Sequence, residues 1–217
     1  MHTGLIFDMD GTMVDNMMVH HRAWQQKLAE VGLSLSLDEV VAKCHGTNDD
    51  ILVRLFGDKY TFEERDAISY AKEALYREVF LPDLKLVDGL HRLLDEGKKR
   101  GLKMGIGTAA RPENVDFVVD TLGIRDYFGA IVTAHDVTKG KPDPEVFLKV
   151  ADQLGVAPEH CLVFEDSPTG AKTAYNAGMK CIVITTTHRS EEFTSIPSVR
   201  RCVPDYTSVR LEEELIS

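Results

Sequence analysis

Short apolar runs alternate with amphipathic stretches along most of the chain. Five runs are bounded by turn residues and have the length of buried strands; they are Gly4–Phe7, Leu102–Gly107, Ala130–Val132, Cys161–Phe164 and Lys180–Thr185. Four stretches repeat apolar residues at helical spacing; they are Leu90–Arg100, Pro112–Leu122, Pro144–Leu154 and Pro168–Asn176. This alternation predicts an α/β fold with a parallel sheet, helices on both faces and right-handed crossovers.

One interval between predicted strands is too long for a single helix. About 95 residues separate the first run from the second, whereas a whole strand–helix–strand unit needs about 30. Apolar residues recur at helical spacing through most of this interval, and no strand pattern interrupts them. We therefore expect a core domain from residues 1–15 and 84–217 and an all-helical domain from residues 16–83. The stretch after Arg189 shows no clear pattern.

Composition and charge narrow the classes of partner. Hydrophobic residues make up 43% of the 217 positions and charged residues 28%, as in globular proteins. The formal net charge of −10 argues against a nucleic-acid surface, because phosphate backbones attract clustered cations. No apolar run approaches the ~20 residues of a membrane helix, and no signal-peptide pattern is visible. We expect a cytoplasmic monomer that binds neither nucleic acid nor membrane.

Chemically reactive side chains follow four of the predicted strands. In an open parallel sheet, ligands bind beyond the carboxyl ends of the strands. We expect the side chains at these ends to converge on one crevice. They are Asp8 and Asp10 after the first strand, Thr108 after the second, Lys139 or Lys141 after the third, and Glu165 with Asp166 after the fourth.

The helices after these strands begin in a way that favours anions. Pro112, Pro144 and Pro168 each stand where a first helical residue is expected, and Asp143 and Ser167 precede two of them as N-caps. Unpaired N–H groups and the positive end of the helix dipole attract negative charge. Three helix N-termini are therefore predicted to point toward an anion at the same edge of the sheet.

A metal ion and a phosphate together reconcile these charges. Acidic groups gathered at one edge repel each other, and Mg²⁺ takes one or two carboxylates while keeping waters and a substrate phosphate. Lys141, Thr108 and helix amides would offset the phosphate. Phosphoryl transfer also needs a nucleophile and a proton donor. Asp8 can attack phosphorus to form an aspartyl phosphate, and Asp10 can act as general acid and then as base for water.

These residues resemble the four motifs of the haloacid dehalogenase superfamily of phosphotransferases, in order and over essentially the whole chain. The motifs are Asp8-x-Asp10-Gly11-Thr12, Thr108, Lys141-Pro142 and Glu165-Asp166-Ser167. The resemblance implies a Rossmann-like core with a helical cap inserted after the first motif. It also implies Asp8 as nucleophile and Asp10 as acid/base.

The same resemblance implies a set of ligands. The Mg²⁺ ligands are Asp8, the Asp10 main-chain carbonyl and Asp166, with Glu165 bound directly or through water. The residues implied to hold the phosphoryl group are Thr108, Ala109 and Lys141.

Within the superfamily, the chain is similar to the β-phosphoglucomutase-like branch. The segments that carry this similarity are His20-His21-Arg22-Ala23-Trp24, His45-Gly46-Thr47 and Lys72-Glu73-Ala74-Leu75-Tyr76. The similarity implies that His20, Lys72 and Asn48 contact substrate. As alternatives, His20 and Lys72 are ordinary helix side chains, and Thr47 or Asn48 caps a helix. The mutases carry an Arg just past the Gly, which this chain lacks, and this departure weakens the mutase hypothesis.

The leading hypothesis is a Mg²⁺-dependent phosphatase acting on a small phosphorylated metabolite, such as a sugar phosphate monoester, through an aspartyl phosphate. A hexose phosphate mutase is the main alternative. A pyrophosphatase and a non-enzymatic phosphoacceptor module of the receiver type are further alternatives. A receiver has no use for a helical insert or for the acid/base role of Asp10.

Overall fold

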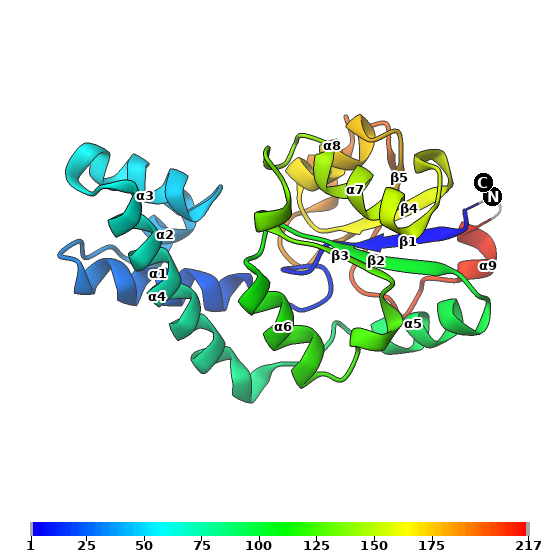
Figure 1. The fold of residues 1–217 in the computed structure, drawn as a ribbon, viewed down its shortest axis with the longest axis horizontal. Helices are drawn as coiled ribbons and strands as arrows, with labels where there is room; N and C mark the ends of the chain where they lie inside the picture. The colour runs from blue at the N-terminus through cyan, green and yellow to red at the C-terminus, as the bar shows by residue number, and fades with distance from the viewer. Residues whose placement is uncertain (1, 216–217) are drawn as a thin grey trace. The chain divides into compact units, whose positions relative to one another are not determined.

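The computed structural model describes residues 2–215, which divide into two compact units. The helical segment Asn16–Leu84 forms one unit, and the chain on either side of it forms the other, which contains the sheet (Figure 1). The outgoing and returning chains are joined inside the sheet unit, because the amide of Val87 donates to the carbonyl of Met13 at 2.9 Å. Among these residues, no helix has both the length and the apolar character needed to cross a membrane.

The sheet unit is built on six parallel strands, which over residues 2–215 lie in the order β3-β2-β1-β4-β5-β6. This arrangement confirms the predicted parallel α/β fold. The sixth strand lies in the stretch after Arg189, which shows no clear hydrophobic pattern, and is only partly buried. The strands are β1 Gly4–Phe7, β2 Lys103–Gly107, β3 Ala130–Val132, β4 Cys161–Glu165, β5 Lys180–Ile184 and β6 Val199–Val203.

The register aligns the carboxyl ends of the central strands. Phe7, the last residue of β1, pairs with Ile106 of β2 and with Phe164 of β4. The amide of Asp8 then donates to the carbonyl of Phe164 at 3.0 Å. Strands β2 and β3 lie on one side of β1, and β4, β5 and β6 lie on the other, so the strand order reverses direction at β1. Open α/β sheets bind ligands at such a switch point.

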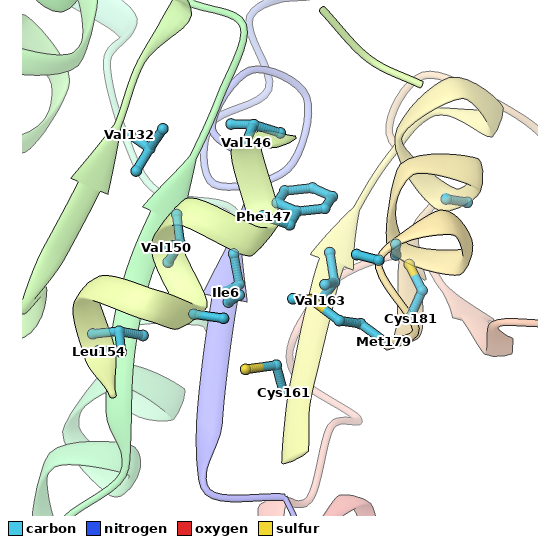
Figure 2. Close-up of a cluster of buried hydrophobic side chains, with 14 of the residues drawn as sticks. Ile6, Val132, Val146, Phe147, Val150, Leu154, Cys161, Val163, Met179 and Cys181 are labelled. Carbon is cyan, nitrogen blue, oxygen red and sulfur yellow. The ribbon is translucent and has the colours of Figure 1, made fainter. Parts of the chain in front are cut away.

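Helices pack on both faces of this sheet. Successive residues of β1 point to opposite faces. Ile6 joins a buried cluster with Val146 and Val150 of α7 (Figure 2), whereas Phe7 stacks on Phe164 with ring centroids 4.9 Å apart. The helices of this unit are α5 Leu90–Lys99, α6 Pro112–Thr121, α7 Glu145–Leu154, α8 Pro168–Asn176 and α9 Leu211–Glu214, with 3-10 turns at Arg125–Tyr127, Ala134–Asp136, Pro158–His160 and Ser190–Phe193.

Two of the three predicted helix starts are confirmed, and one is wrong. Helices α6 and α8 begin at proline, and the Ser167 hydroxyl caps α8 by accepting from the amide of Gly170 at 3.0 Å. Helix α7 begins at Glu145, one residue later than predicted. Pro144 is its N-cap, because its carbonyl already accepts the first helical hydrogen bond. Asp143 therefore lies outside the helix, where its side chain accepts from the Glu145 amide at 3.1 Å.

The second unit is all-helical over its described residues. Helices α1 and α4 pack together, and α2 and α3 complete a small core around Trp24, Leu28 and Leu52. Capping boxes begin α2, α3 and α4, so polar side chains satisfy the first amides of these helices. The bounds are α1 Met17–Glu30, α2 Leu37–Lys43, α3 Asn48–Phe56 and α4 Phe62–Phe80, with 3-10 turns at Gly57–Lys59 and Leu81–Asp83.

Candidate active site

Asp8 is placed by the end of β1 and by the tight turn that follows it. The chain folds back at once, and the Gly11 amide donates to the carbonyl of Val14 at 2.8 Å. Gly11 has a φ of +78°, and a Cβ at this position would overlap with the carboxylate of Asp166. Glycine adopts this conformation without a steric penalty. It therefore lets the loop after Asp8 approach the end of β4.

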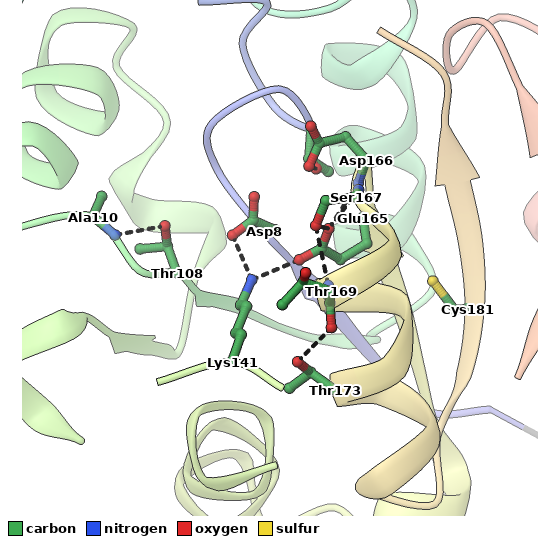
Figure 3. Close-up of polar contacts among 12 residues, drawn as sticks. Asp8, Thr108, Ala110, Lys141, Glu165, Asp166, Ser167, Thr169, Thr173 and Cys181 are labelled. Carbon is green, nitrogen blue, oxygen red and sulfur yellow. Dashed lines mark hydrogen bonds and ion pairs between the residues drawn. The ribbon is translucent and has the colours of Figure 1, made fainter. Parts of the chain in front are cut away.

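Three carboxylates meet where β1 and β4 end. Asp8, Glu165 and Asp166 are all buried, and each offers an oxygen atom within 4.8 Å of the other two. Figure 3 shows the three side chains converging from the ends of their strands. Oxygen donors gathered in this way suit a hard divalent cation such as Mg²⁺. The donor set therefore fits the predicted metal.

Lys141 reaches this acidic group from the loop before α7. Its Nζ atom donates to Oδ1 of Asp8 at 2.8 Å and to Oε1 of Glu165 at 2.6 Å (Figure 3). Burial alone would lower the pKa of Lys141, but the two carboxylates raise it above its usual value, so the ammonium stays charged. The side chain of Lys139 is 73% exposed and forms only a loose ion pair. Of the two candidate lysines, Lys141 is the one at the site.

Glu165 is held by donors on both of its oxygens. Its Oε2 atom accepts from the amides of Asp166 at 2.9 Å and Ser167 at 3.0 Å, and from the Ser167 hydroxyl at 3.1 Å. Burial alone would raise the pKa of Glu165, but Lys141 and these donors lower it. A Cβ at Gly170 would overlap with this carboxylate. Glycine in the first turn of α8 therefore leaves the room that Glu165 occupies.

The other two carboxylates are less well compensated. Burial raises the pKa of Asp8 to about 7. Lys141 lowers this pKa, but repulsion by Glu165 and Asp10 raises it and so offsets part of the effect of Lys141. Burial and the charges of Glu165 and Asp8 also raise the pKa of Asp166 well above its usual value. One ammonium does not balance this acidic group. A divalent cation would correct that imbalance.

The remaining predicted residues of the core lie around this group. The Asp10 carboxylate adds to the raised pKa of Asp8 but is not one of the three that lie within 4.8 Å of one another. Thr108 is buried at the end of β2, and its hydroxyl accepts from the amide of Ala110 at 3.1 Å. Ala109 is exposed between them, three residues before α6 begins.

Sequence reasoning missed the hydroxyl groups that surround Asp166. The Thr12 hydroxyl donates to its Oδ1 atom at 3.4 Å, and the Thr187 hydroxyl donates to its Oδ2 atom. Thr186, one residue earlier, donates to the main-chain carbonyl of Gly11. Thr186 and Thr187 follow β5, so the strand-end rule that found the acidic residues would also have found them.

The predicted substrate residues of the helical unit form a second cluster, in which His20 and Lys72 are buried and Asn48 is half-buried. Lys72 Nζ lies 3.2 Å from Nδ1 of His20 and donates to Oε1 of Glu73 at 2.5 Å. Asn48 donates to the same Glu73 oxygen at 2.8 Å. Burial would raise the pKa of Glu73, but Lys72, His20 and Asn48 lower it to about 2. The three predicted residues therefore meet around a carboxylate that the sequence analysis did not single out.

The Thr47 prediction concerned the start of α3, and the structure settles it. The Thr47 hydroxyl accepts from the amide of Asp50 at 3.2 Å, and the Asp50 carboxylate accepts from the Thr47 amide at 3.2 Å. Thr47 is thus the N-cap, and Asn48 is the first helical residue.

A parallel sheet that gathers three buried carboxylates and a lysine at its strand ends has the layout of an enzyme that handles phosphoryl groups. A comparison with protein-family models identifies the family. Residues 5–184 match the model described as haloacid dehalogenase-like hydrolase, and the chain belongs to this family. It is therefore an enzyme of the phosphatase or phosphotransferase class.

Individual relatives support the β-phosphoglucomutase-like branch. The chain is 32% identical to the fructose-1-phosphate phosphatase YqaB of Escherichia coli over 184 residues, which are 83% of this chain and 95% of that protein. It is 29% identical to the β-phosphoglucomutase of Bacillus subtilis over 217 residues, covering 97% and 94% of the two chains.

A solved structure gives the same result for the fold. The crystal structure of a HAD hydrolase, family IA, variant 3, from Entamoeba histolytica superposes with a TM-score of 0.90 at 27% identity. The match covers 99% of this chain and 98% of that one.

Proposed function

We propose that this protein is a Mg²⁺-dependent phosphatase that hydrolyses a small phosphorylated metabolite, a monoester of the sugar phosphate type. The observation that carries this proposal is the position of Asp8. It is buried beside Glu165 and Asp166, and its Oδ1 atom accepts a hydrogen bond from Nζ of Lys141 at 2.8 Å. A carboxylate in this setting can serve as a nucleophile toward phosphorus.

The cation would be held by the carboxylates of Asp8 and Asp166 and by the main-chain carbonyl of Asp10. Glu165 accepts four hydrogen bonds already, which favours an outer role through water. When bound, Mg²⁺ would offset the negative charge of the carboxylates and of the phosphoryl oxygens.

The residues of the chain divide the chemistry between them. Asp8 attacks phosphorus, so a bond forms from its carboxylate oxygen as the bond to the leaving alcohol breaks, and Asp10 gives that alcohol its proton. Asp10 then takes a proton from water, which attacks the aspartyl phosphate and releases inorganic phosphate and free Asp8. Lys141, Thr108 and the amide of Ala109 hold the phosphoryl oxygens in both steps.

Residues of the helical unit would recognise the leaving group. We assign this role to His20, Lys72 and Asn48, which are linked through Glu73. A mutase needs a cation for a second phosphate, but Thr47 and Asp50 cap α3 at the corresponding place. The charge of Lys72 is already compensated by Glu73. Both features favour a monophosphate and hydrolysis.

A phosphate-release screen tests the proposal. Sugar phosphates, nucleotides and pyrophosphate would be assayed with Mg²⁺ and with EDTA, and Asp8→Asn would serve as the background control. We expect Mg²⁺-dependent release from a sugar phosphate, absent in the variant. Selective cleavage of pyrophosphate would replace the monoester assignment. Interconversion of hexose phosphates without phosphate release, stimulated by a sugar bisphosphate, would show a mutase instead.

A further inference from the structure

The Thr187 hydroxyl stands between the acidic group and a histidine. Its Oγ1 atom donates to Oδ2 of Asp166, lies 3.1 Å from the main-chain oxygen of the same residue, and lies 2.9 Å from Nδ1 of His188. The opposite carboxylate oxygen of Asp166 accepts from Thr12 at 3.4 Å. Asp166 is therefore gripped on both of its oxygens by hydroxyl groups.

Counting protons gives this chain of hydrogen bonds a direction. A threonine hydroxyl carries one proton and can also accept. A carboxylate that binds a metal is ionised and can only accept, so the proton of Thr187 must point toward Asp166. The lone pairs of Oγ1 then face His188, which must donate from Nδ1. The order is His188 to Thr187 to Asp166.

The loop that carries Thr187 is fixed to the sheet along its length. Thr185 is bonded to β6, because its amide donates to the carbonyl of Val203 at 2.8 Å. Thr186 is bonded to the carbonyl of Gly11. The ring of His188 packs edge-on against Phe193, with centroids 6.3 Å apart. The donor that faces Asp166 is thus held in place from three sides.

We propose that Thr187, oriented by His188, is a positioning residue that sets the affinity of the site for its divalent cation. It fixes the rotamer of Asp166 so that a carboxylate oxygen faces Asp8 before the cation arrives. This inference rests on the proposed Mg²⁺ site. Partners that orient metal-binding side chains typically contribute 10–100-fold in metal affinity.

Substitutions at Thr187 test the proposal by metal binding, without an activity assay. Thr187→Val replaces the hydroxyl by a methyl group of similar size, and Thr187→Ser restores it. Mg²⁺ binding would be measured by isothermal titration calorimetry and by the Mg²⁺-induced rise in Tm. We expect Thr187→Val to weaken binding by about 10-fold or more and Thr187→Ser to remain close to the unaltered protein. Thr185→Val, in the same loop, is the matched control: it keeps the main-chain bond to β6 and loses a hydroxyl that donates to the carbonyl of Val203, not to Asp166. It should bind Mg²⁺ normally.

A second pair of variants tests the role of His188. His188→Ala removes the donor to Thr187, whereas His188→Asn offers an amide N–H near the place of Nδ1. We expect weaker Mg²⁺ binding in the first and recovery in the second. If Thr187→Val folds poorly, the comparison of these two variants, together with Thr187→Ser, still decides the matter.

Several outcomes would overturn the inference. Normal Mg²⁺ affinity in a folded Thr187→Val protein would do so, as would an equal loss in Thr185→Val. Failure of the unaltered protein to bind Mg²⁺ would overturn the metal site and this inference together. That result differs from a failure of this inference alone, in which the unaltered protein binds Mg²⁺ and Thr187→Val binds it equally well. In rate assays, the Mg²⁺ concentration for half-maximal activity should rise by a larger factor than kcat falls.

Discussion

The Nζ atom of Lys141 lies 2.8 Å from an oxygen of Asp8, although 133 positions separate the two residues in the sequence. The fold creates this pair, because Lys141 lies in the loop before α7, the helix that connects β3 to β4, and α7 packs against β1, the strand that Asp8 follows. Asp8 is buried, and the side chain of Lys141 is only 11% exposed. Removing one partner from such a pair leaves the other charge without compensation.

Lys141→Met should therefore destabilise the protein. Methionine resembles the aliphatic part of lysine but lacks its charge, so we expect the free energy of unfolding to fall by about 3–5 kcal/mol without metal. Mg²⁺ should restore part of the loss, because a ligand that binds only the folded state stabilises it. Urea titrations with and without Mg²⁺ measure both effects. The exposed Lys139→Met serves as control, with an expected change within ~0.5 kcal/mol; similar losses in both variants would contradict the argument.

Asp8→Asn should abolish turnover while the fold survives. The amide is nearly the same size as the carboxylate but is a poor nucleophile, so we expect phosphate release to fall by on the order of 10⁴-fold or more, as when other catalytic nucleophiles are removed. Circular dichroism and Tm report the fold. The exposed Asp126→Asn is a matched control. Full activity in Asp8→Asn would exclude this residue as the nucleophile.

Asp10→Asn should separate proton transfer from metal binding. Its main-chain carbonyl is retained, so Mg²⁺ affinity should change little, whereas loss of general acid and base should lower kcat by at least ~10²-fold. Calorimetry and steady-state kinetics measure the two quantities. An unchanged rate would reject the proton-transfer role.

Gly170→Ala should be destabilising although it lies in a helix. An exposed helical glycine replaced by alanine gains up to about 1 kcal/mol. Here the new methyl group would overlap with the Glu165 carboxylate, so we expect a lower Tm and weaker Mg²⁺ binding. Gly140→Ala has open space around it and is the control. A stabilised Gly170→Ala protein would show that Glu165 moves aside without cost.

Glu73→Gln should lower stability in a pH-dependent way. The pKa of Glu73 is lowered to about 2 in the folded protein from an ordinary 4.5. A lowered pKa contributes stability that is fully present above the unfolded value and is lost as the pH falls through the folded one. We therefore expect a loss of about 3–5 kcal/mol near neutral pH, shrinking between pH 4.5 and 2. Urea midpoints across this range measure the effect, with the exposed Glu78→Gln as control; a pH-independent difference would contradict it.

The central strands could be predicted because they are buried on both faces and are therefore continuous apolar runs. Strand β6 could not be predicted in this way. It contains Arg200 and Arg201, and most of its residues are only partly buried, so its sequence lacks both the apolar run and the alternation. The predicted start of α7 was one residue too early for a local reason. Pro144 is the N-cap, whose carbonyl accepts the first helical hydrogen bond, and is not the first helical residue.

The site could be predicted as far as its charged residues extend. Asp8, Glu165 and Asp166 are unusual directly after apolar strands, and the structure brings them together. Thr187 also follows a strand but carries no charge, and Glu73 lies inside a helix, so neither residue is unusual in the sequence. Threonine is common after a strand, and a glutamate in a helix is usually solvated. Only the fold shows that Thr187 contacts Asp166 and that Glu73 is buried against Lys72.

The hydrogen bond between Val87 and Met13 closes the sheet unit across the gap through which the chain leaves and returns. The strands, the acidic side chains and Lys141 all lie outside the inserted segment. A helical segment of different sequence could therefore replace this one between Met13 and Val87 while the acidic side chains and Lys141 keep their positions. Such modularity would let descendants of one ancestor diversify in the compounds they accept without reinventing the reaction.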